Sequence, residues 1–193
     1  MEKLKPADLL SLEAYARERQ AFRRRVIEHK RRRQVYLGPN ALLHFEDRLT
    51  MHYQVQEMLR VERIFEPEGI QDELDAYNPL IPDGGNWKAT LMIEFPDEAE
   101  RRERLTALRG IEQATYVQIA GFDKVFPIAN EDLERDDGHK TSSVHFMRFE
   151  LTPGMIAAVK SGTALAVGAD HPYYTHRTEV PERVREALIT DLA

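Results

Sequence analysis

The chain has 193 residues, of which 42% are hydrophobic and 31% charged, with a net charge of −6. This balance predicts a folded chain with a real core rather than a disordered one, and the acidic excess argues against nucleic acid binding by the whole surface. Because the sequence has no cysteine, disulfides, thiolate zinc sites, iron–sulfur ligation by this chain and a cysteine nucleophile are all excluded.

A long first helix opens the chain. Apolar residues at helical spacing predict that it begins near residues 6–9 and ends near Arg33. Arg19, Arg23 and Lys30 share its apolar stripe, so we expect these three side chains to face the interior.

A turn signal follows at Gly38-Pro39-Asn40, between two short apolar runs, and predicts a small hairpin. A helix that starts at Asn40 is the competing interpretation. We place the start of the second helix near residues 47–50 and its end near Phe65. A third, short helix over residues 67–77 begins at a proline, the residue favoured in a first helical turn.

The second helix carries acids and bases where a plain core helix would carry only aliphatic side chains. Glu46, Thr50, Tyr53, Glu57 and Arg60 fall in one sector at 100° per residue, provided the helix starts that early. The opposite side is apolar, so we expect the helix to be buried on both faces. Its charges then need partners, because an unpaired buried charge costs several kcal/mol.

Two interpretations of this constellation stay open. One is a pocket of pre-positioned acids and bases, with Glu57 as the candidate catalytic residue and Arg23, Glu46 and Arg60 as candidate ligand-binding residues. The other is a salt-bridge network between the first two helices that fixes their packing.

The second half of the chain, residues 85–193, alternates strands and helices, and Pro82–Gly85 is the candidate boundary after the helical N-terminal segment, residues 1–84. We expect strands at Trp87–Phe95, Ala114–Ala120, Lys124–Ala129, Ser142–Leu151 and Ala164–Val167. We expect helices at Asp97–Leu108, Pro153–Lys160 and Pro181–Leu192, and an acidic loop at Asn130–Lys140. The predicted fold class is α+β, with long N-terminal helices and a small hairpin, then a mostly antiparallel sheet with helices on one face.

The sequence gives little evidence for a metal-binding site. A carboxylate-bridged dinuclear site needs Glu-x-x-His pairs, and the chain has none. A mononuclear site that uses His145, His171 and Glu94 is geometrically feasible if their strands are neighbours. The alternative is that these histidines are ordinary hydrogen-bonded or surface residues, and we expect no cofactor.

Basic residues concentrate between residues 17 and 33, where nine arginines and lysines stand against Glu18 and Glu28. Aromatic residues rarely interleave with them, which disfavours nucleic acid binding. A solvated helix face is one interpretation, and a docking surface for an acidic protein is the other. No hydrolase, phosphate-loop or dinucleotide motif is present, and no stretch resembles a signal peptide or membrane span, so we expect a cytoplasmic protein.

Several phrases together carry a family resemblance: LKPADLLSLEAYARER, VIEHKRRRQVYLGP, FEDRLTMHYQVQEMLRVERIF, YNPLIP with KATLMIE, KTSSVHFMRFEL and GADHPYY. The set resembles a bacterial domain-of-unknown-function family, over nearly the whole chain. Genes of that family often lie beside those of rubrerythrin and a cysteine-rich iron–sulfur oxidoreductase, which implies a role in oxidative-stress electron transfer with those two proteins as partners. The resemblance defines no functional residue.

Two functions follow as hypotheses. The first, which we favour, is a non-catalytic accessory protein of the rubrerythrin-linked system that docks partners through its basic first helix. The second is a small-molecule-binding protein or enzyme with a polar Glu/Arg pocket between the N-terminal helices and the sheet. The sequence leaves open the reaction, the oligomeric state, including a homo-oligomer, and whether the protein is an enzyme.

Overall fold

The structure is a computed structural model of the whole chain, and it describes residues 2–131 and 140–193. Its helices are η1 (Pro6–Asp8), α1 (Leu12–Lys30), α2 (Arg48–Glu62), α3 (Pro67–Tyr77), η2 (Asn78–Leu80), α4 (Glu98–Ala107), α5 (Ile111–Ala114), α6 (Pro153–Lys160) and α7 (Glu182–Ile189). Its strands are β1 (Gln34–Leu37), β2 (Ala41–Glu46), β3 (Asn86–Ile93), β4 (Thr115–Ile119), β5 (Ile128–Ala129), β6 (Val144–Glu150), β7 (Leu165–His171) and β8 (Tyr174–Glu179). The α+β class, the leading helices and the antiparallel pairing confirm the predicted fold.

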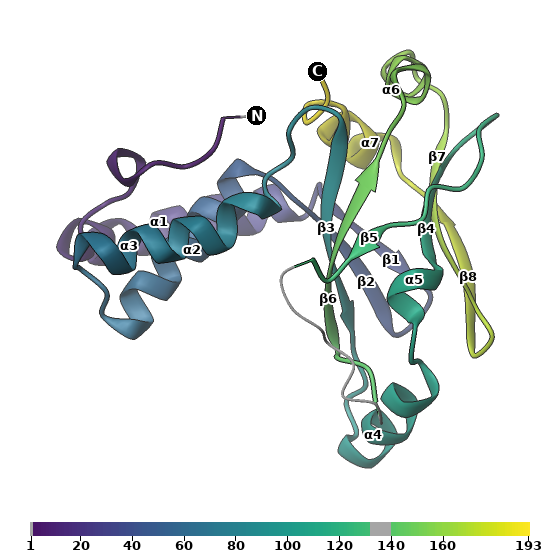
Figure 1. Cartoon of the computed structure of the whole chain (residues 1–193), viewed down its shortest axis with the longest axis horizontal. Helices are drawn as coiled ribbons and strands as arrows, with labels where there is room; N and C mark the ends of the chain where they lie inside the picture. The colour runs from purple at the N-terminus through teal and green to yellow at the C-terminus, as the bar shows by residue number, and fades with distance from the viewer. Residues whose placement is uncertain (1, 132–139) are drawn as a thin grey trace.

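The first three α-helices project to one side of the strands, and we call α1, α2 and α3 the arm (Figure 1). Local signals start each helix. The Ser11 hydroxyl accepts a hydrogen bond from the Ala14 amide at the start of α1, Asp47 and Thr50 form a reciprocal cap at the start of α2, and Pro67 opens α3. The arm has its own small apolar cluster of Leu4, Met51, Val55, Leu59, Leu74 and Ile81.

The predicted hairpin is present, as β1 and β2 joined by a turn in which Gly38 has a φ of 68°. That left-handed conformation suits glycine, and an added Cβ would also meet the His176 ring at 2.6 Å. The hairpin joins a five-stranded sheet in the order β1-β2-β3-β6-β5. Some of the N-terminal stretch 1–84 therefore belongs to this sheet, and a domain boundary near residue 84 stays a prediction.

The strands form two sheets where we expected one. A second sheet has the order β4-β7-β8, and we call the two sheets with α4–α7 the body. The inner faces of both sheets contribute to one large core, which contains Phe45 and Trp87 from the first sheet and Val117 and Val167 from the second.

Two features of the second half differ from the prediction, and a third is not tested. The strand predicted at 124–129 is shorter than expected: only β5 forms, and it joins the first sheet. An isolated β-bridge between Val117 and Val125 connects the start of this stretch to β4. Strand β8 was not expected, because its alternating polar sequence resembles a surface loop. The predicted acidic loop 130–140 lies largely outside the described residues.

Strand alternation gives the five-stranded sheet an inner and an outer face. Ala89 and Leu91 of β3 belong to the shared core, so Lys88 and Thr90 lie on the opposite, outer face. By register, His44 and Glu46 of β2 share that face, since they pair directly with Thr90 and Lys88. Among the described residues, no helix is both long and apolar enough to cross a membrane.

Candidate functional site

Glu57 lies in the seam between α1 and α2, where both of its carboxylate oxygens accept hydrogen bonds. Tyr15 Oη donates to Oε1 at 2.6 Å, and Arg19 binds in a bidentate manner, with Nε 2.7 Å from Oε1 and Nη2 2.8 Å from Oε2. Arg60 Nη2 adds a longer contact to Oε2 at 3.3 Å. The hydrogen bond from Arg19 lowers the pKa of Glu57 to about 2, so this carboxylate is held ionised. This geometry matches the salt-bridge interpretation more closely than that of a general base.

The other residues proposed for a pocket lie apart from Glu57, except for Arg60. Arg23 is exposed on α1, although we expected it to face the interior with Arg19. The reason is geometric: Tyr15 and Val26 define the buried side of α1, and Arg23 lies outside that sector. Glu46 lies on β2 rather than on a helix, with partners of its own.

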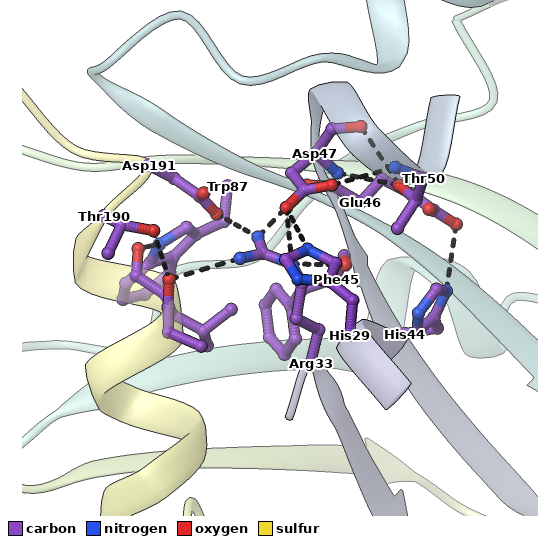
Figure 2. Close-up of polar contacts among 12 residues, drawn as sticks. His29, Arg33, His44, Phe45, Glu46, Asp47, Thr50, Trp87, Thr190 and Asp191 are labelled. Carbon is purple, nitrogen blue, oxygen red and sulfur yellow. Dashed lines mark hydrogen bonds and ion pairs between the residues drawn. The ribbon is translucent and has the colours of Figure 1, made fainter. Parts of the chain in front are cut away.

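A second polar cluster, which we call the base network, lies where the arm meets the body (Figure 2). Its centre is Arg33, whose side chain is 1% exposed. Arg33 Nε donates to the Phe45 carbonyl at 3.1 Å, Nη1 to the Ala187 carbonyl at 3.2 Å and Nη2 to the Glu46 carbonyl at 3.3 Å. Nη2 also forms a short ion pair with Asp191, just after α7. One guanidinium therefore connects the end of α1, the β2–α2 junction and the C-terminal helix.

Asp47 extends the base network toward α1. His29 Nε2 lies 2.5 Å from Asp47 Oδ2, and Arg33 Nε lies 3.4 Å from the same oxygen. Burial alone would raise the pKa of Asp47, but the hydrogen bond from His29 and the charge of Arg33 outweigh burial and lower it to about 2. Burial dominates at Asp191 and raises its pKa to about 6, although Arg33 opposes the rise.

Glu46 and His44 form a buried pair on the outer face of the five-stranded sheet. Glu46 Oε1 accepts a hydrogen bond from Thr90 Oγ1 at 2.7 Å and lies 3.2 Å from His44 Nδ1. Burial raises the pKa of Glu46, but the neighbouring His44 and the charge of Lys30 outweigh it, and the pKa falls to about 2. Glu46 Oε2 and His44 Nε2 are buried and have no hydrogen-bond partner among the described residues.

The three residues proposed for a metal site have separate surroundings. His145 is fully buried and contacts Asn130 and Thr141, at 3.1 and 2.9 Å. His171 Nε2 lies 3.0 Å from the Arg109 carbonyl oxygen, and Glu94 is exposed. Within residues 2–131 and 140–193, no group of three or more histidine, aspartate or glutamate side chains could hold a metal ion.

The basic run of α1 divides into inward and outward residues. Arg19 and Arg33 belong to the two clusters described above. The exposed set, which we call the arginine face, consists of Arg17, Arg23, Arg24, Arg25, Arg31 and Arg32. Arg31 pairs with Glu28 on the same helix at 2.9 Å, and Arg25 lies over the Phe22 ring. The arginine face is otherwise without ion pairs in the described part of the chain.

Sequence reasoning missed most of the base network. Arg33 ends an Arg-Arg-Arg run that is typical of a solvated segment, and its partner Asp191 is 158 residues away. One local signal was available: Asp47 precedes Thr50 by three residues at the start of α2, the spacing of a reciprocal helix cap.

Comparisons with known proteins identify the family and one similar structure. The family model described as protein of unknown function, DUF3501, matches residues 3–192. A crystal structure of a protein of unknown function from Burkholderia pseudomallei K96243 is similar over 100% of both chains, with 48% sequence identity and a TM-score of 0.95. No curated protein matches the chain. Since the family model spans nearly every residue, this chain belongs to the DUF3501 family.

Proposed function

We propose that this protein is a non-catalytic partner protein that docks an acidic protein through the arginine face of α1. The observation that carries the proposal is the concentration of positive charge along a projecting helix, six of whose arginines are exposed. Residues 17–33 have a net charge of +7 in a chain of net charge −6, so the remainder carries −13. Such a segregated charge steers association with a complementary surface.

The spacing of the arginines supports a helical or extended acidic partner surface. Arg17, Arg24 and Arg31 are seven residues apart, so they recur on one line along the outward side of α1, at intervals of about 10 Å. Arg25 and Arg32 flank that line. In the part of the chain that the structure describes, Arg31 pairs with Glu28 and the other exposed arginines form no ion pair, so their charge is available for a second molecule.

The family resemblance suggests which partners to test: rubrerythrin and a cysteine-rich iron–sulfur oxidoreductase, in a cytoplasmic system for oxidative-stress electron transfer. In such a system the redox metals belong to the partners, which is compatible with a chain that has no cysteine. The alternative of a pocket centred on Glu57 has less support, because Tyr15 and Arg19 already occupy that carboxylate.

The test is binding of the two purified partner proteins to the full chain, measured at low and at physiological salt. The double variant Arg24→Glu, Arg31→Glu should weaken binding at least tenfold and reduce its salt dependence. The control variant Arg102→Glu, Arg183→Glu makes the same charge change at exposed positions of the body. Glu57→Gln should leave partner binding unchanged.

Three outcomes would contradict the proposal. The first is no binding of either partner, and the second is an equal loss of binding in the arm and body variants. The third is a preference of the arginine face for duplex DNA over both proteins, which would make the arm a nucleic acid module.

A further inference from the structure

A cavity of about 350 Å³ lies between the end of α3, the following η2 helix and the outer face of the five-stranded sheet. Pro79 and Leu80 of η2, directly after the arm, line one side, and Lys88, Phe146 and Arg148 line the sheet side. This volume is in the range of small-molecule sites, which often form where two parts of a protein meet. The cavity is separate from the Glu57 seam and from the arginine face.

Two cations line this cavity, and they differ in how they are neutralised. Lys88 and Arg148 are direct cross-strand partners in β3 and β6, an arrangement that is unfavourable for like charges. Arg148 is bound by Glu131 in a bidentate manner, at 2.8 and 2.7 Å, and also contacts Glu150. In the described part of the chain, Lys88 has neither a hydrogen bond nor an ion pair.

Among the described residues, Lys88 has no salt bridge because Glu46, its neighbour on β2, is bound by other residues. Glu46 pairs with Lys88 in the register of β2 and β3, so it is the natural candidate for a salt bridge. However, the Glu46 carboxylate is engaged by Thr90 and His44 instead. Within residues 2–131 and 140–193, the half-buried ammonium therefore has three donors without an acceptor. Both burial and the nearby charge of Arg148 lower the pKa of Lys88. An incoming anion would relieve this cost.

We propose that the cavity binds a small organic oxyanion, with its charged head on the Lys88 ammonium and its apolar body against Pro79, Leu80 and Phe146. Two carboxylates limit the charge of the ligand. Asp75 and Glu131 also line the cavity, so a single oxyanion head is favoured and a polyphosphate would be repelled. The proposal does not depend on docking by the arginine face.

The probes that test this proposal are benzoate, phenyl phosphate and the neutral amide benzamide. NMR titration of the full chain at 22.4 kDa gives the response of each residue. Benzoate or phenyl phosphate should shift the signals of Leu80, Lys88 and Phe146, with at least tenfold tighter binding than benzamide. The comparison of the two anions distinguishes a carboxylate site from a phosphate site. Equal binding of benzamide, or no shift at these residues with either anion, would overturn the proposal.

Variants at Lys88 separate a binding role from a structural one. Lys88→Met should weaken binding of the preferred anion at least tenfold and raise the melting temperature of the free protein, because it removes an unpaired half-buried charge. Lys160→Met, at an exposed position at the end of α6, should change neither quantity. A melting temperature that falls while anion binding persists would show that Lys88 is structural. If Lys88→Met does not fold, Lys88→Gln provides the same comparison.

Discussion

The arm and the body of this protein are stabilised in different ways. The body has 28 buried hydrophobic residues in one core between its two sheets, whereas the arm cluster has six among the described residues. The arm compensates with charge: Glu57 joins α1 to α2, and the base network joins the arm to the body. A region with a small apolar core depends on directional polar contacts, so the arm should respond more sharply to loss of a single charge.

The largest effect should come from the joint between the two regions. Arg33→Met would leave Asp191 and Asp47 buried without their cation, at a cost of about 3–5 kcal/mol in the free energy of unfolding. Denaturant unfolding measures this cost. Adding Asp191→Leu to the same chain should recover some of the loss, because one orphaned charge is removed. A loss below about 1 kcal/mol for Arg33→Met would show that the base network contributes little to holding arm and body together.

A core deletion in the arm should separate arm stability from body stability. Leu74 is fully buried in the arm cluster, and Leu74→Ala should cost about 2–5 kcal/mol. Hydrogen exchange should then accelerate in α1, α2 and α3 while β3 and β6 stay protected. Equal acceleration in arm and body would indicate one cooperative unit, and would make the predicted boundary near residue 84 irrelevant to folding.

Loss of charge in the α1–α2 seam should have an intermediate effect. Glu57→Gln keeps the size of the side chain but removes the ionised acceptor of Arg19 and Tyr15, at a cost of about 1–3 kcal/mol. Thermal unfolding measures the change. Glu98→Gln is the matched control, because the pair of Glu98 with Arg102 is exposed on α4 and should contribute less than about 0.5 kcal/mol.

The smallest effects should appear in the pH dependence of stability. Glu57 and Asp47 should stabilise the fold less as pH falls, and Asp191 should stabilise it less as pH rises. Glu57 and Asp47 have lowered pKa values of about 2, so their stabilisation is complete above their unfolded pKa values near 4 and is lost as pH falls toward 2. Asp191, with a pKa raised to about 6, binds its proton more tightly in the folded state, so its contribution weakens as pH rises from about 4 to 6.

Melting temperatures measured across pH 2–7 test both pH dependences. Glu57→Gln should flatten the fall below pH 4, and Asp191→Asn should flatten the change between pH 4 and 6. A Glu57→Gln profile that is parallel to that of the unmodified chain would contradict the assignment for the arm.

Local signals in the sequence anticipated much of the fold. The turn at Gly38, the start of α3 at Pro67 and the alternation along β6 each depend on neighbours within a few residues, and all three are present. The second sheet was not anticipated. Strand β7 is apolar and buried through most of its length, which indicates cover on both faces but does not indicate to which sheet the strand belongs.

The charged clusters show where local reasoning stops. The pairing of Glu57 with a basic residue of α1 follows from two amphipathic helices, and it was one of the two expected arrangements. Whether Arg23 or Arg19 faces inward depends on a small rotation of α1 that the residue pattern does not resolve. The burial of Arg33 depends on Asp191, 158 residues later, so no local window could reveal it.

That separation has a consequence for synthesis. A ribosome produces Arg33 long before Asp191, at about 5–20 residues per second, so for several seconds or more the guanidinium has no carboxylate from the last helix. During that interval Asp47 and the carbonyls of Phe45 and Glu46 are the partners that Arg33 can reach, and the contact with the C-terminal helix is still missing. Completion of the base network is therefore a late step, which needs the last residues of the chain.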